Sequence, residues 1–354
     1  MPRNVTGQII FIFLSLFLFD DAKTFEINRF YEIDWPSGLR QFVRLEEPLK
    51  PVKNSFWQGP THLGHISGVS VDPSGYPVIF HRADRLWGFF TFTKSNHYTE
   101  QAKGPITENT VLKLHPKTGD ILRGWGNNTF YFPHGIHIDN FGNVWLTDIA
   151  LHQVFKYDSS GILKLSLGEP FEPGNDLNHF CQPTSVAVSS STGEIFIADG
   201  YCNSRIVLFD SMGNPKYSID KSTMILNIPH SLTILSNGDL CVADRENERV
   251  VCIIGLTGSK TVFAGRKYSI PVPGRVFAIA SYNDTIYTVN KMMCEYCAMG
   301  YMINPYIQQV VNMWSSGFDF HNPHDIGICQ NSKSLYVSEI GPNRVWKFDL
   351  IKKR

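Results

Sequence analysis

Three Pro-His pairs stand at equivalent positions of a repeated pattern, and their side chains are the ones best suited to hold a metal ion. They are Pro133-His134, Pro229-His230 and Pro323-His324, in the second, fourth and sixth of six repeats. If the repeats close into a ring, alternate members lie about 120° apart and the three imidazoles converge on one axis. A single histidine that begins a strand is more often a hydrogen-bonded packing residue. Three at matched positions favour a metal site with an open coordination position, the type used in zinc catalysis.

Six β-hairpins are the elements that must position these histidines. Each repeat has an apolar alternating strand, a turn rich in Gly, Asn, Ser and Asp, and a second apolar strand. The repeats occupy residues 67–82, 134–148, 184–199, 230–244, 276–290 and 324–339. From the second repeat onward the period is close to fifty residues, which predicts an all-β fold, a six-bladed β-propeller. Two β-sandwiches are the alternative, but they do not require the same hairpin six times.

Two segments outside the hairpins have an expected place in this ring. The segment 25–34 is predicted to supply a strand that closes the ring against the last repeat, since an open ring leaves exposed edges. The first gap between repeats is longer than the others, so residues 83–130 are predicted to carry an inserted loop.

Three further polar residues belong to the same rim as the histidines. In an antiparallel hairpin the start of the first strand and the end of the second lie together, and Arg82, Tyr201 and Arg245 stand at such ends. A tyrosine beside a cation can serve as a base, and a guanidinium suits a carboxylate. The alternative is that the arginines only pair with Asp84 and Glu246.

Acidic residues recur at two places in the repeats. Asp148, Asp199 and Asp244 follow second strands and are interpreted as structural acceptors in turns. Asp325 differs because it follows His324 directly and is expected to face the channel. A carboxylate there could orient a ligand or bind a hard cation such as calcium.

Composition and the N-terminus indicate a secreted globular protein. The 32 basic and 32 acidic residues balance, so the charge pattern of nucleic-acid or anionic-membrane binding is absent. Arg3 precedes an apolar run from Ile9 to Phe19, which predicts a signal peptide over residues 1–22 and a mature domain over 23–354. An uncleaved signal anchor is the alternative, and no later segment is expected to span a membrane.

Cysteines and sequons fit the same compartment. Cys241 and Cys252 flank a tight turn, and Cys181 and Cys202 bracket another repeat, as disulfide partners in a secreted chain would. One further cysteine must remain free or pair outside the chain, among Cys294, Cys297 and Cys329. The sequons predict glycosylation at two asparagines, Asn127 and Asn283.

Five segments together resemble the peptidyl-α-hydroxyglycine α-amidating lyases, six-bladed propellers with NHL-type repeats. The segments are NHFCQPTSVAV, DGYCNSRIV, PHSL, CVADRENERV and PHDI, and the similarity runs from about Gly64 to Phe348. The resemblance implies a zinc ion on His134, His230 and His324, and a structural calcium ion on Asp325 and the carbonyls of Val69 and Ile136. It also implies a catalytic tyrosine at Tyr201, active-site arginines at Arg82 and Arg245, and the disulfides Cys181–Cys202 and Cys241–Cys252.

The activity implied by this resemblance is a carbon–nitrogen lyase reaction, that of a peptidylamidoglycolate lyase. Peptides ending in α-hydroxyglycine would be cleaved to a peptide amide and glyoxylate during the amidation of peptide hormones and neuropeptides, with broad tolerance of the upstream sequence. Vertebrate members carry Met where this chain has Asn322. Because no copper monooxygenase domain precedes the propeller, we expect a stand-alone lyase that depends on a separate peptidylglycine monooxygenase.

Two rival functions use the same fold. A non-catalytic NHL-type propeller would bind a protein or glycan and no zinc. A calcium-dependent propeller lactonase would line its channel with several carboxylates, whereas the expected channel positions of this chain are histidines with Asp325.

Overall fold

The computed structural model describes residues 30–34, 40–44, 47–256, 266–292, 298–317 and 320–352. The predicted signal peptide, Cys294 and Cys297 lie outside these residues. The chain divides into two compact units, a short one, Met1–Glu46, and a large one, Glu47–Arg354. In the short unit β1 (Phe30–Asp34) pairs antiparallel with β2 (Arg40–Arg44).

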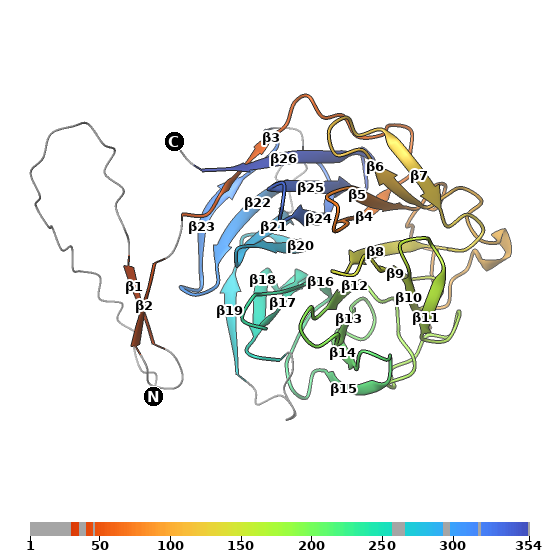
Figure 1. Cartoon of the computed structure of the whole chain (residues 1–354). Coiled ribbons are helices and arrows are strands. Elements are labelled where there is room, and N and C mark those ends of the chain that lie inside the picture. The colour runs from red at the N-terminus through yellow and green to blue at the C-terminus, as the bar shows by residue number, and fades with distance from the viewer. Residues whose placement is uncertain are drawn as a thin grey trace, which may run out of the picture. The chain divides into compact units, whose positions relative to one another are not determined.

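The described part of the large unit forms six four-stranded antiparallel sheets, which are the blades of a propeller (Figure 1). Blade one comprises β4 (Ile66–Val71), β5 (Pro77–His81), β6 (Val111–Leu114) and β7 (Ile121–Trp125). Blade two comprises β8 (Pro133–Ile138), β9 (Val144–Asp148), β10 (Gln153–Tyr157) and β11 (Leu163–Leu167). Blade three comprises β12 (Ser185–Val188), β13 (Ile195–Asp199), β14 (Arg205–Phe209) and β15 (Pro215–Ile219). Blade four comprises β16 (Pro229–Ile234), β17 (Leu240–Asp244), β18 (Arg249–Ile253) and β19 (Lys267–Pro271). Blade five comprises β20 (Arg275–Tyr282), β21 (Thr285–Lys291), β22 (Ala298–Asn304) and β23 (Gln309–Trp314). Blade six comprises β24 (Pro323–Cys329), β25 (Ser334–Glu339), β26 (Val345–Ile351) and β3 (Lys50–Lys53). The predicted all-β six-bladed β-propeller is confirmed.

The last blade is closed by a strand from the N-terminal side of the large unit. β3 pairs antiparallel with β26, with Val52 opposite Asp349 and Pro51 opposite Leu350. The prediction that residues 25–34 close the ring is therefore wrong, because β3 occupies the edge of β26 and β1 pairs with β2 instead. β3, which directly precedes the first blade in the chain, thus completes the last blade. The exposed edge of β26 is covered by this pairing.

Each blade is apolar on both faces because a neighbouring blade covers each face. The second strands show this most clearly, since every residue of β9, β13 and β17 is buried. Between the third and fourth blades, Phe196 and Leu208 pack in one cluster with Leu240 and Val242. These contacts fix the angle between neighbouring sheets and so the position of each inner strand around the axis.

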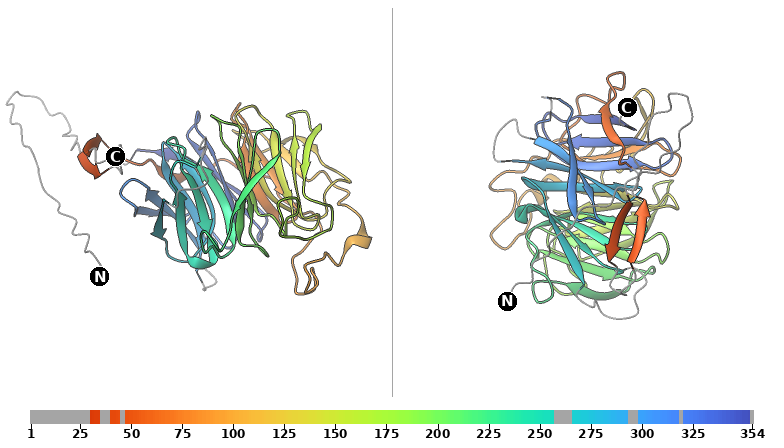
Figure 2. Two further views of the ribbon diagram at one scale, coloured as in Figure 1. Left: turned by 90° about the horizontal axis from the view of Figure 1, so that it is seen from below. Right: turned by 90° about the vertical axis from the view of Figure 1, so that its left-hand side faces the viewer.

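The predicted insertion lies within the first blade, between β5 and β6. It contains the single-turn helix η1 (Gln101–Lys103), and Figure 2 shows it standing out from one face of the propeller. A second short turn, η2 (Arg245–Asn247), follows β17. The helices in the described residues are thus single 3-10 turns, too short to serve as a membrane span.

Candidate metal centre and active site

Three imidazoles from alternate blades meet at one end of the channel. His134, His230 and His324 are each buried, and their ligand atoms all lie within 4.8 Å of one another. The three ring-centroid distances are each 4.9 Å, so the rings form an equilateral triangle. This cluster, hereafter the histidine centre, has the spacing from which three nitrogens can converge on one metal ion.

The intervening blades orient the imidazoles. Each histidine donates its Nδ1 hydrogen to a backbone carbonyl of the next blade, because a carbonyl oxygen can only accept. The bonds are 2.9, 2.6 and 2.7 Å long and join His134 to Thr184, His230 to Phe277 and His324 to Ser67. Protonated Nδ1 leaves the lone pair of Nε2 free, which is the tautomer that a metal-binding histidine with a carbonyl partner adopts.

A glycine makes one of these contacts possible. A Cβ on Gly135 would lie 2.3 Å from the carbonyl oxygen of Thr184, the acceptor for His134. A larger residue at this position would push the third blade away from the second. Gly135 therefore lets the acceptor approach its histidine.

Burial keeps the imidazoles neutral. It lowers the pKa of His134 and His230 well below the ordinary value, and that of His324 to about 3. The guanidinium of Arg245 adds to the effect at His230, and that of Arg82 at His324. A neutral imidazole is the form that binds a metal, and the nearby positive charges favour an anionic ligand.

Buried carboxylates hold the turns that lead into the Pro-His pairs. Asp148 Oδ2 accepts hydrogen bonds from the backbone N–H groups of Tyr131 (2.7 Å) and Phe132 (2.9 Å), directly before Pro133. In the sixth blade, Glu339 Oε1 accepts from two backbone N–H groups before Pro323, those of His321 (2.7 Å) and Asn322 (3.0 Å). In the fourth blade, Asp244 accepts from Asn227 N–H at 2.7 Å. The acidic residues after second strands are thus structural acceptors, as predicted, and Glu339 takes the role that Asp has elsewhere.

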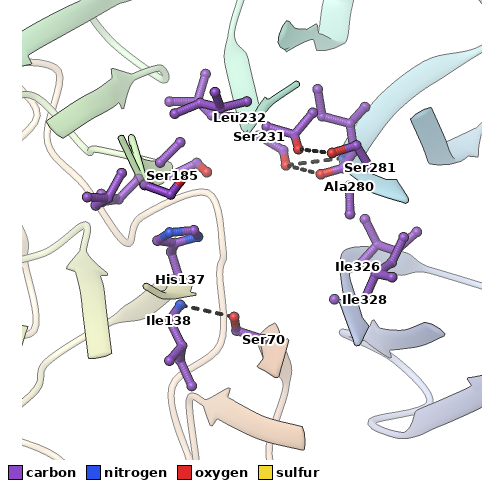
Figure 3. Close-up of a pocket in the computed structure, with 18 of the residues that line it drawn as sticks. Ser70, His137, Ile138, Ser185, Ser231, Leu232, Ala280, Ser281, Ile326 and Ile328 are labelled. Carbon is purple, nitrogen blue, oxygen red and sulfur yellow. Dashed lines mark hydrogen bonds between the residues drawn. The ribbon is translucent and has the colours of Figure 1, made fainter. Parts of the chain in front are cut away.

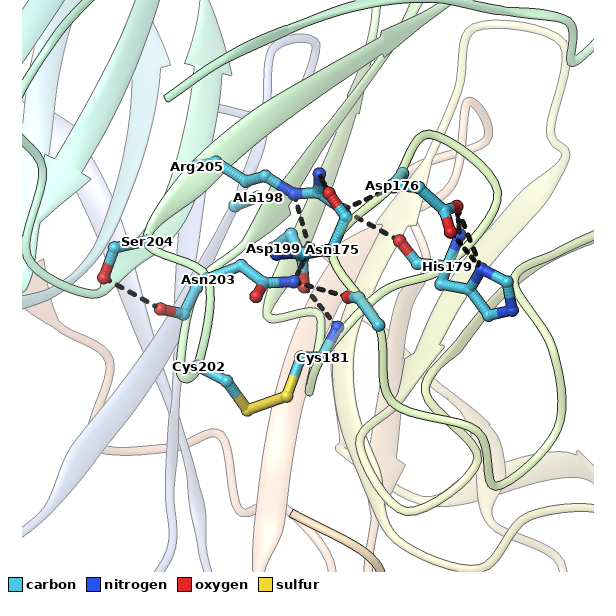
Figure 4. Close-up of polar contacts among 12 residues, drawn as sticks. Asn175, Asp176, His179, Cys181, Ala198, Asp199, Cys202, Asn203, Ser204 and Arg205 are labelled. Atoms are coloured by element: carbon cyan, nitrogen blue, oxygen red, sulfur yellow. Dashed lines mark hydrogen bonds and ion pairs between the residues drawn. A yellow bond between two sulfur atoms is a disulfide. The ribbon is translucent and has the colours of Figure 1, made fainter. Parts of the chain in front are cut away.

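Tyr201 reaches into the histidine centre. Its hydroxyl lies 2.9 Å from His134 Nε2 and 3.2 Å from His230 Nε2, and can donate to either. The disulfide Cys181–Cys202 fixes the residue that follows it. Figure 4 shows the network behind this loop, in which Asp199 pairs with Arg205 Nε at 2.9 Å. The disulfide and this ion pair therefore hold the loop that carries Tyr201.

The two arginines differ in their partners. Arg82 is buried, donates Nε–H to the carbonyl of Pro133 at 2.8 Å, and leaves Nη2 without a hydrogen-bond partner. Asp84 pairs instead with Arg85. Burial lowers the pKa of Arg82 to about 10, so it remains cationic at neutral pH. Arg82 is thus a buried cation with an unused donor, the feature expected of an anion-binding residue.

Arg245 is placed at the other side of Tyr201. Its Nε lies 2.8 Å from Glu246 Oε1, so the predicted alternative pairing exists. The guanidinium also lies over the rings of Tyr201 and Phe277, at 5.3 and 5.2 Å from their centroids. The histidine centre, Tyr201 and the two arginines therefore occupy one mouth of the channel.

Asp325 and the two residues expected to share a calcium ion with it line the deeper channel. Val69, Ile136 and Asp325 border a cavity of about 580 Å³ between the inner strands, and Figure 3 shows other inner-strand residues around the same open centre. Asp325 Oδ2 accepts from Val69 N–H at 2.9 Å. Burial raises its pKa to about 7, and no basic side chain among the described residues forms an ion pair with it. A buried carboxylate of this kind fits a cation ligand.

The remaining predicted residues lie outside this mouth. Cys241 and Cys252 form a disulfide across neighbouring strands of the fourth blade. Cys329 is a buried free thiol. Asn127 and Asn283 are exposed.

Sequence reasoning missed the carbonyl partners of the histidines and the aromatic residue beside Tyr201. Trp87 packs on Tyr201 with ring centroids 5.0 Å apart. No repeat signal points to Trp87, because it belongs to the insertion.

The fold and the site define a class: a six-bladed propeller with a three-histidine centre at its axis. A model of the NHL repeat matches residues 180–209 and 226–253. A solved streptogramin B lyase structure shares the fold, with a TM-score of 0.50 and 14% identity over 85% of this chain and 97% of that one.

Curated relatives define the family more narrowly. Peptidyl-alpha-hydroxyglycine alpha-amidating lyase 2 of Drosophila melanogaster is 44% identical over 85% of this chain and 76% of its own length. The peptidylglycine alpha-amidating monooxygenase of Rattus norvegicus is 39% identical over 94% of this chain, which spans only 35% of that protein. The chain belongs to the peptidyl-α-hydroxyglycine α-amidating lyase family, and the resemblance noted in its sequence is confirmed.

Proposed function

We propose that the protein is a zinc-dependent lyase that converts peptides ending in α-hydroxyglycine to peptide amides and glyoxylate. The observation that carries this proposal is the placement of the Tyr201 hydroxyl against two Nε2 atoms of the histidine centre, with the Arg245 guanidinium over its ring. The buried Arg82 lies nearby, on the carbonyl of Pro133 that precedes His134. Zinc would be held by His134, His230 and His324, and would supply Lewis acidity to a bound substrate oxygen.

The chain's own residues account for substrate orientation. The substrate carries a carboxylate and a hydroxyl on the same carbon. The unused Nη2 donor of Arg82 is suited to the carboxylate, in a buried position where a charge-assisted hydrogen bond is strong. Arg245 is the second cation that can position this group.

Tyr201 is the group placed to move the proton. Cleavage breaks the bond between the amide nitrogen and the carbinol carbon, while the hydroxyl oxygen becomes the aldehyde oxygen of glyoxylate. The hydroxyl must lose a proton and the amide nitrogen must gain one, so the net reaction transfers a proton without a redox cofactor. In our proposal Tyr201 acts as its phenolate: Oη receives the hydroxyl proton and passes it to the departing amide nitrogen, which leaves Tyr201 unchanged after the reaction.

A structural calcium ion is proposed for the channel. Asp325 would provide its carboxylate, with backbone carbonyls of Val69 and Ile136 from the first and second blades. Bound there, calcium would compensate the buried carboxylate and tie three inner strands together. Glycosylation of the exposed Asn127 and Asn283 is proposed as well.

We also place this activity in the secretory pathway, in the amidation of peptide hormones and neuropeptides. The two disulfides support an oxidising compartment. The substrate would come from a peptidylglycine monooxygenase, an activity named in related proteins such as the rat protein.

The test measures metal content and product in the same preparation. The purified protein is expected to contain one zinc ion and to release glyoxylate from N-benzoyl-α-hydroxyglycine. Tyr201→Phe is expected to retain zinc and to lower kcat by about 100-fold or more, because the proton acceptor is lost.

Tyr217→Phe is the matched control, since Tyr217 is a partly buried residue of the same blade that packs against apolar side chains. It should leave turnover unchanged. Zinc binding without glyoxylate release in the unmodified protein would refute the lyase function. Unchanged turnover in Tyr201→Phe would remove only the role of Tyr201.

A further inference from the structure

An apolar surface stands beside the mouth of the channel, on the insertion of the first blade. Phe89 and Phe90 are 92% and 80% exposed, and Leu86 and Trp87 are 62% and 42% exposed. Four large apolar side chains within five residues are costly to expose to water unless they bind something.

The insertion presents these side chains from a fixed backbone. Arg85 is buried and donates from Nη2 to the carbonyl of Gly104 at 2.8 Å, which ties the two ends of the loop together. Thr91 Oγ1 accepts from Gly88 N–H at 2.7 Å, and Thr99 Oγ1 donates to the Phe90 carbonyl at 2.7 Å. The backbone that carries the aromatic side chains is therefore fixed before any ligand arrives.

Of these side chains, Trp87 is the one that reaches the site. Trp87 contacts both Tyr201, at 5.0 Å between ring centroids, and Phe132, at 5.7 Å. Phe132 in turn lies under the guanidinium of Arg82, at 4.9 Å. A ligand atom that is bound beside Tyr201 is thus separated from Trp87 only by the ring of Tyr201.

The opposite side of the mouth is charged and polar. Glu246 pairs with Arg245 at 2.8 Å and with Arg275 at 2.9 Å. Lys291 Nζ donates to Asn322 Oδ1 at the entry to the sixth blade. The exposed side chains at the mouth are therefore aromatic on the side of the insertion and charged or polar on the other side, while the buried Arg82 lies against Phe132 on the side of the insertion.

We propose that Trp87, with Phe89 and Phe90, binds the side chain of the residue that immediately precedes α-hydroxyglycine, and that the enzyme prefers an apolar or aromatic residue there. This inference rests on the proposed function. Because Arg82 is buried against Phe132, a carboxylate bound by Arg82 leaves the preceding residue to extend outward past the more exposed Trp87. The sequence alone predicts broad tolerance, whereas the structure adds a graded preference.

The experiment compares two substrates, N-acetyl-Phe-α-hydroxyglycine and N-acetyl-Ser-α-hydroxyglycine, by glyoxylate release. The unmodified enzyme should favour the Phe substrate in kcat/KM by about tenfold, a discrimination typical of apolar contacts. The difference should lie mainly in KM, because the contact is made equally in the ground and transition states. Trp87→Ala should reduce the ratio of kcat/KM for the Phe substrate to that for the Ser substrate to about 2 or less, because one apolar contact is lost.

Two further variants keep the test decisive. Phe89→Ser combined with Phe90→Ser changes only exposed side chains and should also lower the ratio, even if Trp87→Ala does not fold. Phe141→Ser is the control, since Phe141 is 83% exposed in the turn between β8 and β9 on the opposite rim, and it should keep the ratio of the unmodified enzyme.

The inference is overturned by a ratio near one in the unmodified enzyme, or by an unchanged ratio in both aromatic variants. An unchanged ratio with loss of binding to phosphatidylserine vesicles in the double variant would assign the patch to a lipid surface instead. No glyoxylate from either substrate would refute the proposed function itself, and the inference with it.

Discussion

The buried histidines of this protein fall into two kinds, which the partner of Nδ1 separates. In the histidine centre Nδ1 donates to a carbonyl, so that Nε2 carries the lone pair that can bind a metal or accept from Tyr201. His152 is also fully buried, but its Nδ1 accepts from the backbone N–H of Gln182 at 3.0 Å. This acceptor role joins the second blade to the loop beside Cys181 and requires the neutral imidazole.

His152 leads to a prediction on pH dependence. Burial lowers its pKa to about 4 from the ordinary 6.5, so the unfolded chain binds more protons than the folded one between these values. The stability that the neutral ring provides is therefore present above pH 6.5 and is lost as the pH falls toward 4. His152→Asn keeps a hydrogen-bond acceptor that does not titrate. At pH 5 the melting temperature of this variant should therefore have fallen by several degrees less than that of the unmodified protein.

Thermal melts of the unmodified protein and the variant from pH 8 to pH 4 check this expectation. His62→Asn, at an exposed histidine, is the control and should follow the unmodified protein. If the melting temperatures of His152→Asn and the unmodified protein fall equally as the pH is lowered, His152 has no part in the acid sensitivity.

At the scale of elements, the turns before the inner strands decide where each histidine lies. Proline restricts the backbone before the histidine, and a buried carboxylate binds the N–H groups just ahead of it. The carboxylate stands at the end of the second strand of the same blade. Each hairpin therefore supplies both the histidine and the group that fixes its approach.

Glu339 allows this arrangement to be tested. Glu339→Ala leaves the N–H groups of His321 and Asn322 without their acceptor, and should weaken zinc binding by about tenfold, as loss of outer-shell support commonly does. Glu339→Gln retains Oε1, the atom that accepts both bonds, and loses only Oε2, the acceptor of Trp346 Nε1–H. This variant should bind zinc within about threefold of the unmodified protein.

Zinc affinity measured by competition with a chelator distinguishes these variants. Asp158→Ala is the matched control, because Asp158 also accepts two backbone N–H groups, from Ser160 and Ile162, but in a turn between outer strands. Equal zinc affinity in Glu339→Ala and the unmodified protein would assign Glu339 to stability alone.

For the whole molecule, ring closure depends on four residues near the start of the large unit. Removal of residues 1–46 leaves β3 in place and should not change the melting temperature of the propeller. Removal of residues 1–53 exposes the edge of β26 and should lower the melting temperature by about 5–10 °C, since the strand's hydrogen bonds and burial are lost.

Hydrogen exchange of β26 amides provides the local measurement. The shorter truncation should preserve their protection, and the longer one should abolish it at Asp349 and Ile351, which lie opposite Val52 and Lys50. The amide of Leu350 should stay protected, because it donates to the carbonyl of Lys333. Full protection after removal of residues 1–53 would show that the ring closes without β3.

The repeat, the six hairpins and the Pro-His pairs were predictable because each is a local pattern. Alternating apolar residues indicate strands, and matched positions in alternate repeats indicate convergence once the ring is assumed. The closing strand was predicted wrongly because residues 25–34 and 50–53 both have strand character, and nothing local shows which of them meets β26. Trp87 was missed for a similar reason, since an insertion has no equivalent in the other repeats.

The amino-acid sequence by itself determined the kind of fold, the donor set of the metal centre and the residues that share its rim. Only the tertiary structure decided which nitrogen of each histidine is free, that Tyr201 lies between His134 and His230, and that aromatic side chains border the mouth. The reason is physical: these features depend on contacts between blades, such as that of His324 with Ser67, 257 positions away in the chain. Spacing along a chain does not specify such contacts until the blades have packed.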